Sequence, residues 1–111
     1  MVILTVRVSP RRRAAFLRFI DRAFPFYEGP GGIHMTLFED LEKPGTYVEI
    51  ASYDTLDDFD SDQERVRSNP ESLRVLSEWR GFLAGPPEVR LVQNTHRRRR
   101  RSSVGRRART A

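Results

Sequence analysis

The sequence predicts an α+β fold in which a four-stranded antiparallel sheet carries helices on one face. Three observations lead to this prediction. Four short stretches have the β-branched or alternating composition of strands, two regions carry apolar residues at helical spacing, and the elements follow the order β-α-β-β-α-β. That order is typical of the ferredoxin-like fold, for which we expect the strand order 4-1-3-2.

The first half of the chain supplies one strand and one helix. Residues 2–8 are rich in β-branched side chains, which favours a strand. Pro10 suits a first helical turn, and an apolar stripe predicts a helix over residues 10–24. We expect Pro25 to end this helix, because its ring clashes with the preceding turn, and residues 25–32 to form a loop. The stripe comprises Phe16, Leu17, Ile20, Ala23 and Phe24.

A β-hairpin is predicted next. Side chains alternate in character over residues 32–40 and again over residues 46–53. Pro44 and Gly45 lie between the two runs and are typical turn residues. Two strands joined by a short turn form an antiparallel pair.

The second helical region contains two helix starts. One lies near Thr55, and the other is at Asn69, which can cap a helix that Pro70 opens. The proline-rich residues 85–87 end this region, and residues 88–93 have the composition of a last strand.

The alternation also assigns strand side chains to two faces of the sheet. One set is wholly apolar and is expected under the helices: Leu4, Val6, Val8, Ile33, Met35, Leu37, Val48, Ile50, Val89 and Leu91. The other set is mixed: Ile3, Thr5, Arg7, His34, Thr36, Phe38, Tyr47, Glu49, Ala51, Tyr53, Arg90 and Val92. A solvated face rarely carries so many large apolar groups, so we expect something to cover it.

The charge is divided unevenly along the 111 residues. The net charge is +5, but residues 96–111 hold eight arginines and no acidic residue, which leaves a net charge of −3 in residues 1–95. We therefore expect a folded domain over residues 1–95 and a disordered Arg-rich tail over residues 96–111. The absence of cysteine fits a reducing compartment, and no signal peptide or spanning segment is evident, so we expect a cytoplasmic protein.

Three short motifs resemble a known family. Phe38-Glu39-Asp40, the run from Pro44 to Glu49, and Leu56-Asp57-Asp58-Phe59 are similar to segments of antibiotic-biosynthesis-monooxygenase-like domains, which belong to the dimeric α+β barrel superfamily. Some of these domains are fused to the C-terminus of major-facilitator transporters. They carry an arginine on the first strand, where this chain has Arg7. The resemblance covers about residues 2–93.

The resemblance implies a homodimer in which two sheets meet face to face and cover the mixed face. It also implies binding of a small, partly apolar molecule and cofactor-independent monooxygenation of a small aromatic or quinol-type substrate, with no cofactor and no metal. Many family members have a histidine where this chain has Asp62-Gln63-Glu64, so the resemblance does not extend to haem binding or other chemistry of that imidazole.

Several side chains are candidate site residues. His34 is the candidate general base, because imidazole is the side chain best suited to proton transfer at neutral pH. Thr36 and Tyr47 are expected beside it, where they could hold a phenolic ligand. Arg7 and Glu49 are expected on one face as an ionic pair, which would either orient a polar substrate or fix the register of a dimer interface. The remaining substrate-binding candidates are Tyr53 and Trp79, and core packing is the alternative role of Trp79.

A second function class stays open. The chain could be a non-catalytic ligand-binding or assembly module whose arginines Arg97, Arg98, Arg99, Arg100 and Arg101 bind polyanions, or the tail could be a dispensable extension. An RNA-binding module of the same topology is less favoured, because Glu49 would repel phosphate and Thr5 stands where an aromatic platform is expected.

Overall fold

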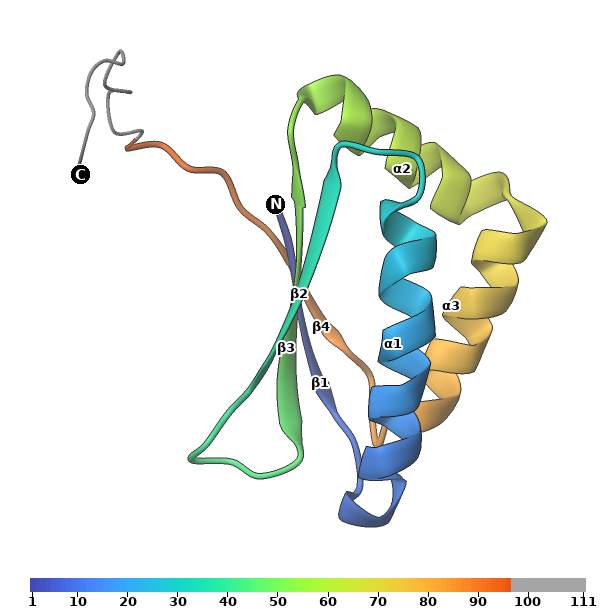
Figure 1. Ribbon diagram of the computed structural model, residues 1–111. Coiled ribbons are helices and arrows are strands. Elements are labelled where there is room, and N and C mark those ends of the chain that lie inside the picture. Colours follow the sequence, from blue (N-terminus) through green and yellow to red (C-terminus); the bar gives the residue numbers. More distant parts are fainter. Residues whose placement is uncertain (97–111) are drawn as a thin grey trace, which may run out of the picture.

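The computed structural model describes residues 1–96 and confirms the ferredoxin-like α+β fold (Figure 1). Four antiparallel strands form one sheet in the order β2-β3-β1-β4, and the helices cover one of its faces. The strands are β1 (Val2–Arg7), β2 (Ile33–Glu39), β3 (Thr46–Tyr53) and β4 (Glu88–Leu91), and the helices are the short 3-10 turn η1 (Pro10–Arg12), α1 (Arg13–Glu28), α2 (Leu56–Ser68) and α3 (Pro70–Phe82).

Helix α1 is longer than predicted. It continues through Pro25 to Glu28, so the expected loop starts only at Gly29. A proline inside a helix costs about 3 kcal/mol, and packing offsets that cost here. Tyr27 packs against the core, and the Glu28 carboxylate accepts a hydrogen bond from the backbone N–H of Met35 at 2.8 Å. Tertiary contacts of the last turn therefore override the local signal of Pro25.

The starts of α2 and α3 follow the prediction. Thr55 caps α2 by accepting from the N–H of Asp58, and Asn69 caps α3 by accepting from the N–H of Ser72 at 2.9 Å. Pro70 occupies the first helical position of α3, where its missing N–H leaves no partner unsatisfied.

The predicted faces are right for β1 and β2 and wrong for β3. The register places Val6 opposite Tyr47 and Leu4 opposite Glu49, and residues opposite one another share a face. Tyr47, Glu49, Ala51 and Tyr53 therefore point toward the helices. Val48 and Ile50 lie on the open face, contrary to the prediction.

The core explains the reversed face of β3. Phe16 and Phe19 of α1 are fully buried, and the ring of Tyr47 lies 5.1 Å from that of Phe16. Tyr47 buries more area against α1 than Val48 could, whereas the β-branched Val48 and Ile50 suit a half-buried surface. Both faces of β3 are thus apolar in part, so alternation alone does not tell which one faces the helices.

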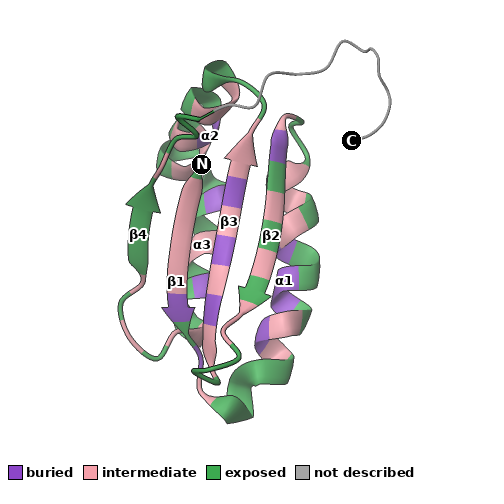
Figure 2. Cartoon of the chain, turned by 90° about the vertical axis from the view of Figure 1, so that its left-hand side faces the viewer, coloured by how far each residue is buried: buried purple, intermediate pink, exposed green. Residues whose placement is uncertain are grey.

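Within residues 1–96, no helix lies on the second face of the sheet (Figure 2). Ile3 lies opposite Ile50, and Phe38 lies opposite Val48 with 53 % of its surface exposed. The same face also carries polar side chains from all four strands: Thr5, Arg7, Thr36, Thr46 and Arg90. Apolar patches of this kind are typical of contact surfaces in proteins.

Among residues 1–96, no helix combines the length and apolarity needed to cross a membrane. The predicted polyanion-binding arginines, Arg97 to Arg101, lie outside the described residues.

Candidate functional site

A cavity of about 290 Å³, here called the inner cavity, lies between the helix-facing side of the sheet and helices α2 and α3. Most of its wall surface is apolar, and several polar groups also reach it, a combination found in small-molecule sites. The polar groups are contributed by Glu49, Tyr53, Asp62, Gln63, Ser72, Arg80, Tyr27 and the indole of Trp79. The apolar walls are Val2, Leu4, Met35, Ala51, Val66, Leu76, Pro87 and Val89.

Glu49 is the buried carboxyl of this cavity, with 4 % of its surface exposed. Burial disfavours its charged form and raises its pKa from 4.5 to about 7. None of the ion pairs among residues 1–96 involves Glu49. A carboxyl that titrates near neutrality beside an apolar cavity can take a proton from a ligand.

The single tryptophan of the chain lies next to this carboxyl. Trp79 is buried, and its indole N–H is close enough to Glu49 to act against the rise in the carboxyl pKa that burial causes. The contact does not meet hydrogen-bond geometry, since Trp79 Nε1 has no partner within residues 1–96. A buried donor without a partner is costly, so this N–H is available to a ligand oxygen.

Tyr53 and Asp62 form a second polar pair in the cavity wall. The Tyr53 hydroxyl donates to Asp62 Oδ2 at 2.6 Å, and the other carboxylate oxygen lies 3.6 Å from the Arg65 guanidinium. Burial and the neighbouring carboxylate raise the pKa of Tyr53. The hydroxyl therefore stays neutral, and because its proton is engaged, its oxygen can accept a hydrogen bond from a ligand.

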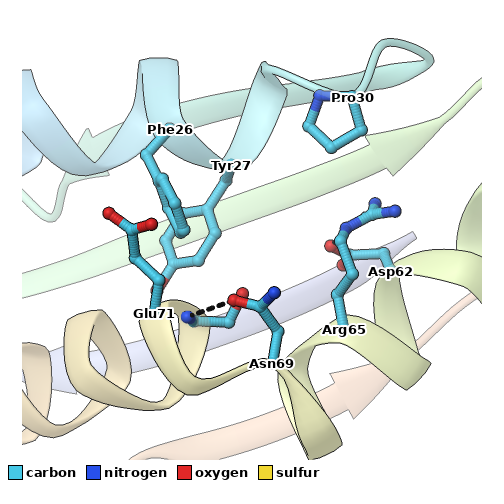
Figure 3. A pocket seen from close by; sticks show the side chains of 8 residues that line it. Phe26, Tyr27, Pro30, Asp62, Arg65, Asn69 and Glu71 are labelled. Carbon is cyan, nitrogen blue, oxygen red and sulfur yellow. Dashed lines mark hydrogen bonds and ion pairs between the residues drawn. The ribbon is translucent and has the colours of Figure 1, made fainter.

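A second cavity of about 210 Å³, here called the outer cavity, lies between the end of α1 and the junction of α2 and α3 (Figure 3). Phe26 and Tyr27 stand on one side, and Arg65 and Asn69 stand on the other. The complete lining is Phe26, Tyr27, Pro30, Asp62, Arg65, Asn69, Glu71 and Ser72.

The structure brings together three of the predicted site residues, since Glu49, Tyr53 and Trp79 all line the inner cavity. Tyr47 is buried in the adjacent core and does not line either cavity. We expected Tyr47 and His34 on one face of the sheet. Instead, Tyr47 faces the helices and His34 lies on the opposite side.

Three other candidates lie on the open side of the sheet. His34 and Thr36 are exposed on β2, and the His34 imidazole contacts Asp54 Oδ1 at 2.9 Å. Arg7 is on the face opposite to Glu49, so the predicted Arg7–Glu49 ion pair does not form. The guanidinium of Arg7 lies instead against Gly85, where a Cβ atom would collide with it.

Sequence reasoning missed Tyr27, Asp62 and Arg80. Tyr27 was placed in a loop, and Asp62 was considered only as one of the residues that stand in place of the family histidine. Asp62 is the one buried residue of α2, and it stands where many members of the resembled family have a histidine. That departure from the family pattern was the available signal for a site residue.

Comparisons with known proteins agree with this fold. No protein-family model matches the sequence, and no curated protein matches it either. Solved structures do: a putative antibiotic biosynthesis monooxygenase from Nitrosomonas europaea has a TM-score of 0.69 at 14 % identity, and the match covers 86 % of this chain and 88 % of that one.

Two further structures are informative. A putative antibiotic biosynthesis monooxygenase from Bordetella bronchiseptica is 26 % identical with a TM-score of 0.64, over 86 % of this chain and 95 % of the other. SnoaB from Streptomyces nogalater, a cofactor-independent oxygenase, is 20 % identical with a TM-score of 0.66, over 85 % of this chain and 92 % of its own. The chain therefore has the fold of the antibiotic biosynthesis monooxygenase-like proteins.

Proposed function

We propose that the protein is a cofactor-independent monooxygenase that binds a small aromatic or quinol-type substrate in the inner cavity, with Glu49 as the general base. The observation that carries this proposal is the buried Glu49 carboxyl beside an apolar cavity and the Trp79 N–H. Within residues 1–96 the carboxyl has no ionic partner and the N–H has no hydrogen-bond partner. The fold shared with SnoaB supports the same reaction class.

The chemistry needs few protein groups. Glu49 takes the proton of an aromatic hydroxyl, and the Trp79 N–H and the apolar walls favour the electron-rich anion that remains. This anion transfers electrons to O₂ and forms a C–O bond at a ring carbon. Loss of water then leaves a quinone: one oxygen atom enters the product, the other leaves as water, and the substrate supplies all four electrons.

The same proposal includes a homodimer. An apolar centre lies on the sheet face that no helix of residues 1–96 covers; it consists of Ile3, Val48, Ile50 and Phe38. The equivalent face of a second copy is the occupant that the resemblance implies. Its sheet would place the uncovered apolar side chains of both chains against one another.

Oxygen uptake tests the proposed reaction. Purified protein is mixed with a panel of hydroquinones and phenols in an oxygen electrode, and the wild type is expected to consume one O₂ per quinone formed. Glu49→Gln keeps the shape of the side chain but cannot take a proton, so we expect turnover to fall by roughly 100-fold. Glu88→Gln, an exposed change on β4, serves as the matched control.

His34→Ala separates the two candidate bases in the same assay. Turnover that falls in His34→Ala and persists in Glu49→Gln would move the base to the open face and contradict this proposal. Absence of uptake across the panel, with ligand binding retained, would favour the non-catalytic binding module.

A further inference from the structure

The inner and outer cavities meet at three side chains. Tyr27, Asp62 and Ser72 line both cavities, and they come from the end of α1, from α2 and from the start of α3. These three residues are here called the neck. The neck lies between the apolar cavity that contains Glu49 and the more polar cavity that contains Arg65.

Two of the neck residues are held in place by their neighbours. The Asp62 carboxylate accepts the Tyr53 hydroxyl and faces the Arg65 guanidinium. Ser72 is fixed by the N-terminal cap of α3, where Asn69 Oδ1 accepts from its backbone N–H (Figure 3).

The third neck residue, Tyr27, is only half-buried. Burial, Glu49 and Asp62 together raise the pKa of Tyr27 to about 12, so its hydroxyl is neutral and can donate toward either carboxylate. The neck is therefore polar, and its one charge, on Asp62, already has a cationic partner in Arg65.

The outer cavity offers hydrogen-bond donors without an unbalanced charge. Arg65 is paired with Asp62, and the Glu71 carboxylate lies 3.7 Å from Arg74. Asn69 uses its oxygen to cap α3, which leaves its amide N–H groups to donate toward the cavity. A carbonyl or hydroxyl oxygen matches these donors better than a carboxylate or an ammonium group would, since a charged group would disturb a balanced set.

We propose that the outer cavity is a second binding subsite, reached through the neck, for an uncharged oxygen-bearing arm of the ligand whose ring occupies the inner cavity. This inference rests on the proposed function, because it takes the inner cavity as the ring site. It defines the substrate class more narrowly, as an elongated aromatic hydroxyl compound with a neutral polar arm.

Four phenols with the same ring test the proposal on the full chain. They are 4-ethylphenol, 3-(4-hydroxyphenyl)propanamide, the corresponding propanoate, and tyramine. Affinity is read from the single indole N–H resonance of Trp79 in nitrogen-15 correlation spectra. We expect the amide to bind about fivefold tighter than 4-ethylphenol, the gain from one net hydrogen bond, and the two charged compounds to bind no tighter than 4-ethylphenol.

Two pairs of variants identify the subsite. Arg65→Ala removes a donor of the outer cavity and should abolish the advantage of the amide, whereas Arg67→Ala, an exposed change on the same helix, should keep it. Ser72→Phe fills the neck and should likewise abolish the advantage, with the exposed Ser77→Phe as its control. If Ser72→Phe fails to fold, the Arg65 pair decides the matter alone.

Equal affinities of the wild type for the amide and 4-ethylphenol would overturn the inference, and so would an amide advantage that persists in Arg65→Ala. These results leave the proposed function intact. If 4-ethylphenol itself produces no shift of the Trp79 resonance, the ring site and the proposed function fail together with the inference.

Discussion

The proposed chemistry depends on one residue, Glu49. It is almost completely buried, it has no ionic partner within residues 1–96, and it lines a cavity. Replacing such a carboxyl with an apolar residue would avoid a desolvation cost, so its presence at this place points to a functional role.

The raised pKa of Glu49 predicts a pH-dependent stability. The folded protein keeps a proton on Glu49 up to a pKa of about 7, whereas the unfolded chain releases it near 4.5. The corresponding stabilisation is complete below pH 4.5 and is lost as the pH rises through 7. Glu49→Gln cannot ionise at this position, so it should not show this loss. Between pH 4.5 and 8, the free energy of unfolding of the wild type should therefore fall by about 3 kcal/mol more than that of Glu49→Gln.

Urea unfolding followed by Trp79 fluorescence measures this difference at the two pH values. Glu88→Gln, with an exposed carboxyl, should keep the pH dependence of the wild type. Identical profiles for Glu49→Gln and the wild type would show that Glu49 ionises normally and would remove the argument for it as a base.

At the scale of elements, the junction of α2 and α3 shapes both cavities. Asn69 follows the last residue of α2 and caps α3. Its side-chain oxygen accepts a hydrogen bond from the backbone N–H of Ser72, and Ser72 lines both cavities. A single residue therefore lies at the point where two walls of the site meet and holds the first turn of one of them.

Removal of this cap should be costly. Asn69→Ala leaves the Ser72 N–H without its partner, and we expect the free energy of unfolding to fall by about 1 kcal/mol. Asn69→Asp retains an acceptor and should recover most of the loss, while Asn94→Ala, outside any helix, should have little effect. Chemical denaturation of the four proteins provides the check, and an unaffected Asn69→Ala would show that the cap does not hold the junction.

At the scale of the whole molecule, the uncovered sheet face predicts self-association. Ile50→Lys would place a charge at the centre of this face, so we expect it to convert a dimer at micromolar concentration into single chains that remain folded. Sedimentation velocity gives the mass, and circular dichroism confirms the fold. Leu73→Lys, an equally drastic change at an exposed site on α3, should leave the dimer intact. A wild type that sediments as a single chain would refute the dimer.

The Arg-rich tail predicts a separate, salt-dependent interaction. Deletion of residues 96–111 should leave cooperative unfolding unchanged, because the core lies within β1 to β4 and the helices. Retention of the full chain on immobilised heparin should fall steeply with salt and should disappear in the truncated protein. Loss of cooperative unfolding on truncation would show that the domain extends past residue 95.

Much of the fold follows from local signals in the chain. The β-branched run of β1, the Pro-Gly turn between β2 and β3, and the caps at Thr55 and Asn69 act within a few residues, so their effects can be read without the rest of the molecule. The element order then restricts the sheet to the topology observed.

Tertiary structure decided the rest. Pro25 stays helical because the turn after it is tied to the core and to β2. Strand β3 turns Tyr47 inward, and Glu49 with it, because Tyr47 packs against the Phe16 ring of α1. The site depends on this choice of face, since a strand that turns over moves every side chain to the opposite side. The sequence by itself determined the elements and their order. Only the packing of α1 against β3 decided that Glu49 enters a cavity, because burial depends on residues far apart in the chain.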